Sequence, residues 1–418
     1  MARRIVVVGG GFAGLWAAAG AARALDLARP TSTDIEVVLV APDPRHVIRV
    51  RCYEADLAPV ALPLDAVLAP IGVRRVEAAV TAIDPAARRL TLGAGTLGYD
   101  RLVLAAGSTL RRPPVPGLAE HALDVDSLPG AERLARHLAG LGARPDGAGR
   151  WTAVVIGAGL VGIEIACELP GRLAAAMRAA GQPGRPRVVL LERGASVGVG
   201  MGAAAPAIRE ALAALGVEAR TGTAPRAVEA DAVLLADGER IPAATVLCAT
   251  GMQASPLAAS LGLPCDGLGR LAADPWLAVP GAPGLYAAGD LAAAEAAPGH
   301  ATVMSCQHAR PMGRIAGHNA ACDLLGREAE RVRFAAPDYV TILDLGPWGA
   351  AYTRGWDRDS LVLGGAAAKQ VKRRINGERI YPPPGGDRAA ILAAAAPVIQ
   401  AAPTGAAPGA APGAARPA

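Results

Sequence analysis

The 418-residue sequence has few aromatic residues, only 3% of the total, and its cysteines are not closely spaced. The six cysteines form no CxxC or CxxxxC pair, so neither a metal cluster nor a redox-active dithiol of neighbouring residues is expected. Scattered cysteines of this kind are typical of a reducing compartment. Glycine or charged residues interrupt every apolar stretch before it reaches 18 residues, so the sequence predicts no membrane-spanning helix.

The sequence also lacks the basic clusters with interleaved aromatics that are typical of nucleic-acid-binding proteins. Its formal net charge is only +5, and the basic residues are scattered, so we expect no nucleic-acid partner. From Met1 the chain runs directly into an apolar strand at residues 5–8, without the separate charged and apolar regions of a signal peptide. We therefore expect a cytoplasmic protein.

An internal repeat is the most informative feature of the sequence. Residues 3–25 and residues 150–169 each indicate a buried strand, a glycine turn and a helix rich in small residues. A second apolar strand follows in both cases, at residues 36–40 and at residues 188–191. Strands that alternate with helices predict βαβ units in parallel sheets, and hence the α/β class.

The two repeats extend into two similar halves. Gly107 ends a strand 98 residues after Gly9, and Gly251 ends a strand 94 residues after Gly157. This agreement predicts two Rossmann-like dinucleotide-binding domains, which a chain of this length can accommodate, and a small C-terminal α+β domain. The predicted ranges are 1–112 and 256–330 for the first domain, 113–255 for the second, 331–400 for the C-terminal domain and 401–418 for a disordered tail rich in Ala, Pro and Gly.

The first glycine motif, Gly9-x-Gly11-x-x-Gly14, lies between a strand and a helix. In this context the glycines allow a tight turn, a close approach of backbone to pyrophosphate, and close packing of helix on strand. A purely structural turn is the alternative, but the strand–turn–helix context favours a dinucleotide. Ala41 stands where an acidic residue is expected, so either Asp43 binds the ribose or the ribose is held otherwise. The predicted contacts are Gly9, Gly10, Gly11, Phe12, Ala13, Gly14 and Asp43.

The second glycine motif, Gly157-x-Gly159-x-x-Gly162, also lies between a strand and a helix. An acidic residue, Glu192, stands at the end of the strand that follows. A carboxylate there can accept both ribose hydroxyls and would repel a 2′-phosphate, which favours NADH over NADPH. Arg193 argues in the opposite direction, and a solvated surface carboxylate is the alternative for Glu192. The predicted NAD contacts are Gly157, Gly159, Leu160, Gly162, Glu192 and Gly251.

Two dinucleotide sites on one chain suit the passage of hydride from one cofactor to another. The run LYAAGD, residues 285–290, places Asp290 after a strand that ends in glycine, where it can bind the ribityl chain of FAD. The N-terminus of the following helix would stabilise negative charge on the flavin. An ordinary helix N-cap is the alternative for Asp290. The predicted FAD contacts on this side are Ala106, Gly107, Gly289, Asp290 and Val303.

Five motifs, VVVGGGFAG, LVLAAGS, VVIGAGLVGIE, ATGM and LYAAGD, occur in an order that resembles a known family. Over residues 3–384 the chain is similar to the flavoproteins with two dinucleotide-binding domains, and within them to the type II NADH dehydrogenases. The resemblance implies FAD, NADH and a quinone acceptor. It also implies that Glu164 lies near the junction of nicotinamide and flavin, where it relays protons or positions the acceptor. The alternative is a carboxylate that the helix dipole favours.

The sequence departs from that family after Asp290. Where the family has an AQxxxQ-like pair that lines its quinone pocket, this chain has Thr302 and Cys306, with Gln307 adjacent. Thr302 and Gln307, with His308, remain candidates to line an acceptor cavity. For Cys306, a reactive thiol and a packed thiol are both considered. The departure favours a reductase of a soluble acceptor or protein carrier, as in ferredoxin reductases. A redox-sensing flavin-binding interaction protein is a separate alternative.

The C-terminal part carries a basic stretch with apolar residues between its charges. Its cations are Lys369, Lys372, Arg373 and Arg374, and its apolar residues are Val371, Ile375 and Ile380. Such a stretch can lie on an anionic bilayer, as the resemblance implies, or form a solvated helix edge. We therefore consider a peripheral membrane contact and a homodimer. His300 and His308 lack a third ligand nearby in sequence, so no metal site is predicted.

Overall fold

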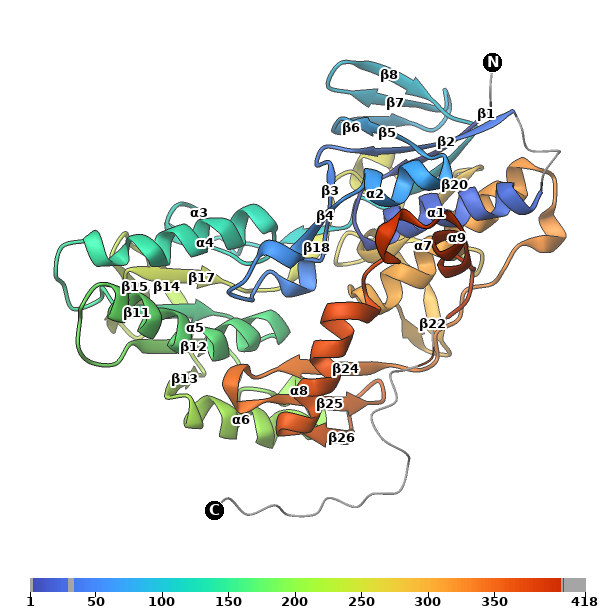
Figure 1. The fold of residues 1–418 in the computed structure, drawn as a ribbon. Helices are drawn as coiled ribbons and strands as arrows, with labels where there is room; N and C mark the ends of the chain where they lie inside the picture. Colours follow the sequence, from blue (N-terminus) through green and yellow to red (C-terminus); the bar gives the residue numbers. More distant parts are fainter. Residues whose placement is uncertain (1–2, 29–33, 400, 402–418) are drawn as a thin grey trace.

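The computed structural model describes residues 3–28, 34–399 and 401 (Figure 1). The first domain is built on a five-stranded sheet in which every strand pair is parallel. After the arginines with which they begin, its central strands are apolar and buried, as expected for a sheet that is covered on both faces. In sheet order the strands are β20 (Leu285–Ala287), β9 (Arg101–Leu104), β1 (Arg3–Val8), β2 (Ile35–Ala41) and β5 (Arg74–Glu77).

Helices α1 (Phe12–Leu27) and α7 (Cys306–Leu324) pack closely on this sheet. A Cβ atom added at Gly313 would lie 2.2 Å from the carbonyl oxygen of Ala13, and one at Gly317 would lie 1.9 Å from that of Ala17. Only glycine permits such contact between helix backbones. The packing places the N-terminus of α7 beside the glycine turn that precedes α1.

The second domain has a parallel four-stranded sheet with its own apolar core. Val8 pairs with Val40 in the first sheet, and Ile156 pairs with Leu191 in the second. The two glycine turns therefore begin at equivalent positions of their sheets. The strands in order are β13 (Val217–Thr221), β12 (Arg187–Glu192), β11 (Thr152–Ile156) and β17 (Thr245–Cys248), with helices α4 (Leu128–Gly140), α5 (Leu160–Ala179) and α6 (Ala205–Ala214).

The C-terminal segment contacts both domains. Its three strands form an antiparallel sheet, and the chain then passes back to α1, as the orange and red ribbon in Figure 1 shows. Strand β24 packs on α5, and α9 packs on α1. Its elements are β24 (Val340–Asp344), β25 (Ala350–Arg354), β26 (Ser360–Gly364), α8 (Gly365–Arg374), a π-helical turn (Ile375–Arg379) and α9 (Arg388–Ala394).

The predicted α/β class, with two Rossmann-like domains and a small α+β domain, is confirmed. Within the described ranges no helix has the length and apolarity needed to cross a bilayer. The predicted disordered tail lies outside the described residues, apart from Ala401. The remaining strands and α-helices are β3 (Arg45–Val47), β4 (Ala61–Pro63), α2 (Asp65–Leu68), β6 (Val80–Asp84), β7 (Arg89–Leu92), β8 (Gly95–Gly98), β10 (Ser108–Leu110), α3 (Leu118–His121), β14 (Pro225–Val228), β15 (Ala232–Leu235), β16 (Arg240–Pro242), β18 (Met252–Ala254), β19 (Leu271–Ala272), β21 (Ala292–Ala293), β22 (Glu295–Ala297) and β23 (His300–Ala301).

Candidate functional site

The first glycine turn contains two glycines that the packing requires and one that faces open space. Gly9 has φ +115°, and a Cβ atom there would lie 2.3 Å from the carbonyl oxygen of Ala105. A Cβ atom at Gly14 would lie 1.8 Å from the carbonyl oxygen of Gly9. Around Gly11, in contrast, no atom of the described residues, apart from its chain neighbours, lies within 4 Å of the Cβ position. The open space at the N-terminus of α1, which begins at Phe12, fits the pyrophosphate of a dinucleotide.

The second turn repeats this geometry. Gly157 has φ +102°, with the carbonyl oxygen of Ala249 at 2.5 Å from its Cβ position. A Cβ atom at Gly162 would lie 1.9 Å from the carbonyl oxygen of Gly157, and the surroundings of Gly159 are open. Helix α5 begins one residue later, at Leu160. This second N-terminus therefore fits another pyrophosphate in the same way.

Glu192 lies beside the second turn at the end of β12. Its Oε2 accepts a hydrogen bond of 3.1 Å from the backbone N–H of Ala158, and its Oε1 accepts one of 2.7 Å from that of Gly194. These bonds hold the carboxylate beside the second glycine turn, and its binding of ribose stays a prediction. By strand register, the equivalent residue of the first half is the buried Ala41.

Asp43 is already paired in the structure. Its Oδ1 accepts hydrogen bonds of 2.9 Å from the backbone N–H and from Nε of Arg45, and its Oδ2 accepts one of 2.9 Å from Nη2. The Arg45 guanidinium lowers the pKa of Asp43 below its ordinary value. These contacts give Asp43 a local structural role, and its binding of ribose stays a prediction.

On the flavin side, Asp290 is joined to the turn at Gly107 through Ser108. The Ser108 hydroxyl donates a 2.6 Å hydrogen bond to Asp290 Oδ2, and Nη1 of Arg49 donates to the same hydroxyl over 2.8 Å. Burial raises the pKa of Asp290, and the contacts with Ser108 and Arg49 offset this only in part. Ser108 follows Gly107 directly in sequence, but no sequence signal identifies Arg49.

Gly289 shapes the approach of this loop to the helices. It has φ +77°, and a Cβ atom there would lie 2.7 Å from Cβ of Ala13 and 3.6 Å from that of Ala309. The loop that carries Asp290 is thereby held between the first turns of α1 and α7. The predicted FAD residues Ala106, Gly107, Gly289 and Asp290 accordingly lie close to the first glycine turn.

The N-terminus of α7 is fixed by hydrogen bonds within its own segment. Ser305 caps the helix by accepting from the backbone N–H of His308, and Nδ1 of His308 accepts a 2.9 Å bond from the N–H of Val303. The Thr302 hydroxyl is buried and bonds to the backbone of β21 and of the residue after it, at 3.3 Å on each side. Nε2 of Gln307 donates to the carbonyl of Asp338 over 3.0 Å. These contacts do not direct Thr302 or Gln307 toward an acceptor, so their predicted role stays a prediction.

Cys306, the first residue of α7, is a partly buried free thiol. Burial raises its pKa, and the positive charges of Arg310 and Lys372 lower it only in part. A protonated thiol is a poor nucleophile, which favours the packed-thiol interpretation.

Glu164, on α5, is buried and forms an ion pair with a residue that lies 208 positions later in the chain. Nζ of Lys372, on α8, donates to Glu164 Oε1 over 2.8 Å, and the backbone N–H of Asp344 donates to the same oxygen over 3.1 Å. Burial raises the pKa of Glu164 despite the attraction of Lys372. Burial lowers the pKa of Lys372, but the Glu164 and Asp344 carboxylates outweigh this and the net pKa is raised. The pKa of each group in the pair is therefore raised above its ordinary value.

A second ion pair lies next to the first. Lys369 pairs with Asp344, and the Tyr53 hydroxyl donates a 3.1 Å hydrogen bond to the other oxygen of that carboxylate. Nζ of Lys372 lies 5.7 Å from the centre of the Tyr53 ring. Tyr53, in a loop of the first domain, thus contacts two residues of the C-terminal segment, Asp344 and Lys372.

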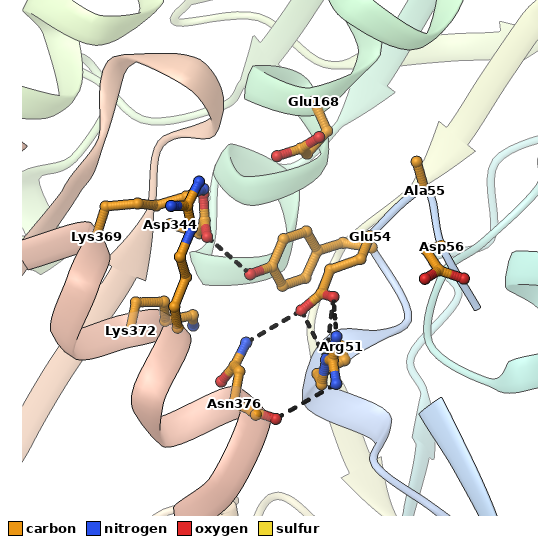
Figure 2. Close-up of a pocket in the computed structure, with 12 residues that line it drawn as sticks. Arg51, Glu54, Ala55, Asp56, Glu168, Asp344, Lys369, Lys372 and Asn376 are labelled. Carbon is orange, nitrogen blue, oxygen red and sulfur yellow. Dashed lines mark hydrogen bonds and ion pairs between the residues drawn. The ribbon is translucent and has the colours of Figure 1, made fainter. Parts of the chain in front are cut away.

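Beside these pairs lies a cavity of about 300 Å³, in which Figure 2 shows side chains from three parts of the chain facing one another. Lys369, Lys372 and Asn376 come from the C-terminal segment, and Glu168 comes from α5. The complete lining is Arg51, Tyr53, Glu54, Ala55, Asp56, Glu168, Asp344, Lys369, Lys372, Arg373, Asn376 and Gly377.

The basic stretch considered for a membrane contact or a solvated helix edge is organised differently. Lys369 and Lys372 point inward to carboxylates, and Arg373 and Arg374 alone of its four cations are exposed. Ile380, predicted for its apolar side, is buried within the protein. Lys369 and Lys372 therefore belong neither to a basic surface nor to a solvated edge, because internal carboxylates neutralise their charge, and the membrane contact stays a prediction.

Two dinucleotide cradles on parallel sheets, with an acidic residue beside each predicted cofactor, define an oxidoreductase that uses FAD and NADH. Residues 3–313 match the family of pyridine nucleotide-disulphide oxidoreductases, and the chain belongs to that family.

The relatives agree with this class. The chain is 53% identical over 403 residues to an NADH dehydrogenase-like protein of Mycobacterium tuberculosis (strain CDC 1551 / Oshkosh), covering 96% of this chain and 100% of that protein. It is 31% identical over 345 residues to the demethylphylloquinone reductase NdbB of Synechocystis, covering 78% and 80% of the two chains. The structure of NDH2 from Plasmodium falciparum in complex with NADH has the same fold, with a TM-score of 0.76 over 94% of this chain and 97% of that one, at 11% identity. The resemblance to type II NADH dehydrogenases is confirmed.

Proposed function

We propose that this oxidoreductase transfers electrons from NADH to a quinone. FAD, when bound, accepts hydride from NADH and passes two electrons to the acceptor. Reduction of a quinone to its quinol takes two electrons and two protons. The hydride accounts for both electrons and one proton, so each turnover draws one more proton through the protein or from solvent.

The chain's own residues bind and orient the reactants. The turn at Gly11 and the first turn of α1 would hold the FAD pyrophosphate, with Asp290, Ser108 and Arg49 on the ribityl side. The turn at Gly159 and the carboxylate of Glu192 would hold NADH. Orientation of this kind supplies much of the rate enhancement in hydride transfer.

The observation that carries the quinone proposal is the buried pair of Glu164 and Lys372. It lies one turn into α5, close to the cradle assigned to NADH, and its buried carboxyl group and ammonium can carry a proton where bulk solvent does not reach. A quinone that accepts electrons also requires a proton donor, whereas a one-electron protein carrier does not. The name of the Synechocystis relative, a demethylphylloquinone reductase, supports the same choice.

The test begins with purified protein that contains FAD. Anaerobic addition of NADH should bleach the flavin absorbance, and menadione should then restore it with repeated turnover. Glu164→Gln should leave the bleaching rate unchanged and slow the reoxidation by menadione, most strongly at high pH, where solvent supplies fewer protons. Equal reoxidation rates for the two proteins across pH 6–9 would contradict the role of Glu164. Bleaching without any quinone turnover would contradict the proposed function.

A reductase of a soluble protein carrier is the second candidate. It is favoured by the Thr302 hydroxyl, which is engaged with backbone where a quinone-binding side chain was expected. Turnover with ferredoxin, but not with menadione, would support it. A cytoplasmic protein attached to the membrane surface, and a homodimer, remain predictions that fractionation and light scattering would test.

A further inference from the structure

The guanidinium of Arg49 lies between loops that follow parallel strands of both domains. Its Nη1 donates hydrogen bonds of 2.8 and 3.1 Å to the hydroxyl and the carbonyl oxygen of Ser108, which follows Gly107 in the turn after β9. Its Nη2 lies 3.2 Å from Sδ of Met252, which follows Gly251 in the turn after β17. One side chain thus contacts both the turn predicted to bind FAD and the turn predicted to bind NADH.

These turns lie where a flavin and a nicotinamide would meet. In open parallel sheets, ligands bind in the crevice outside the carboxyl ends of the strands. Strands β9 and β20 end at this crevice from the first domain, and β17 ends at it from the second. A flavin held through Asp290 and a nicotinamide held beside Gly251 therefore converge on the position of Arg49. The Arg49 side chain is only 27% exposed, so a ring that covers it excludes most of its remaining water.

Two carboxylates flank the Arg49 guanidinium. Nη2 pairs with Asp126 over 2.6 Å, and Nη1 lies 3.8 Å from Oδ2 of Asp290. Asp126 lies in the segment that leads from the first domain into α4, and its side chain is 15% exposed. A second cation that acts on Asp290, Arg270, is itself paired with Asp266 over 2.7 Å. Arg49 is therefore the cation that links both carboxylates of this junction.

Reduction by hydride places negative charge at the same junction. The C4–H bond of the nicotinamide breaks, its hydrogen and both bonding electrons pass to N5 of the flavin, and NAD⁺ leaves. The flavin thereby gains two electrons and one proton, so its ring carries one negative charge until a further proton binds. A cation beside the ring stabilises the reduced form relative to the oxidised form, and a carboxylate does the opposite.

We propose that Arg49 and Asp126 set the reduction potential of the bound flavin as an opposed pair. Arg49 favours the reduced flavin and Asp126 favours the oxidised one. Because their charged atoms lie 2.6 Å apart, the two fields partly cancel in the parent protein, and removal of either residue leaves the other uncompensated. This role goes beyond the proposed function, since it concerns the flavin and holds for any acceptor.

The experiment uses purified protein loaded with FAD and contains no quinone. Arg49→Gln and Asp126→Asn each remove one charge and keep hydrogen-bonding groups. Arg112→Gln is the matched control, because Arg112 pairs over 2.8 Å with Asp124, two residues before Asp126.

Two properties of the flavin are measured anaerobically in each protein. The first is the midpoint potential, determined against a redox dye. The second is the Kd for sulfite, whose sulfur electron pair forms a bond to N5 of the oxidised flavin and leaves negative charge on the ring. Both report charge beside the flavin, which a purely structural role of Arg49 would not alter.

Arg49→Gln should lower the midpoint potential by about 30 mV, which is a tenfold change in the equilibrium between the two forms of a two-electron couple. Its Kd for sulfite should rise about tenfold for the same reason. Asp126→Asn should shift both properties in the opposite direction, with a higher potential and tighter sulfite binding. Arg49→Lys, which keeps the charge, and Arg112→Gln should each leave the Kd for sulfite within about threefold of the parent value.

Shifts of the same sign in Arg49→Gln and Asp126→Asn would indicate a general disturbance of the site and would overturn the inference. Unchanged potential and sulfite binding in Arg49→Gln would overturn it as well. If Arg49→Gln loses FAD, Asp126→Asn decides, because it must still raise the potential. Failure of every quinone to reoxidise the flavin would refute the proposed function alone, since no quinone enters these measurements.

Discussion

Replacing Lys372 with methionine should destabilise the folded protein strongly. The side chains of Lys372 and Glu164 are 10% and 8% exposed, and a 2.8 Å hydrogen bond joins them. Removing the ammonium leaves a buried carboxylate with one remaining donor, the N–H of Asp344. Breaking a buried ion pair from one side costs about 3–5 kcal/mol, and we expect a loss in this range at pH 8.

The loss should depend on pH in a defined direction. Burial already raises the pKa of Glu164 above its ordinary 4.5, and removal of Lys372 raises it further. Folded Lys372→Met therefore binds a proton that the unfolded chain releases, so its stability falls as pH rises from about 4.5 through the folded pKa. In the parent, the contribution of Lys372 is complete below its ordinary pKa of 10.5 and is lost only as pH rises through the raised folded value. The difference between variant and parent should be smaller at pH 5.5 than at pH 8.

Urea unfolding of the FAD-loaded protein, followed by tryptophan fluorescence at both pH values, measures the effect. The double variant Glu164→Gln, Lys372→Met should recover more than half of the lost stability, because no charge remains buried alone. Arg373→Met, a neighbouring exposed cation, should change stability by no more than about 0.5 kcal/mol. A loss for Lys372→Met below about 1 kcal/mol, or the same loss at both pH values, would refute the reasoning.

Three further predictions follow from the cradles and the helix packing. Gly11 has φ −75° and open space around it, so Gly11→Ala should fold normally but retain less than a tenth of the FAD. Gly14→Ala should lose FAD and also about 3 kcal/mol of stability. Flavin absorbance and urea unfolding distinguish the two variants. Glu192→Ser should raise the ratio of kcat/KM for NADPH over NADH about tenfold, and an unchanged ratio would remove Glu192 from the ribose site. Gly317→Ala should destabilise the protein by about 2 kcal/mol, because its Cβ atom would lie 1.9 Å from the Ala17 carbonyl oxygen. This net loss allows for the higher helix propensity of alanine, which favours the variant by about 1 kcal/mol. An unchanged urea midpoint would show that α1 and α7 can separate at no cost.

The features that could be predicted from sequence are those whose contacts are local. The contact between Gly14 and the carbonyl of Gly9 lies within one strand–turn–helix unit, and the motif spacing encodes it directly. The same holds for Gly157 and Gly162. Because both units recur at matching distances from a second glycine-ended strand, the duplicated α/β architecture was also accessible.

Contacts between distant segments left no comparable signal. Arg49 meets Ser108 and Asp290 only because three separate loops converge at the ends of parallel strands. The pairing of Lys372 with Glu164 depends on the path of the C-terminal segment, which no spacing rule specifies. The inward direction of Lys369 and Lys372 could not be predicted for this reason: a cation that faces solvent and one that faces a buried carboxylate have the same sequence pattern.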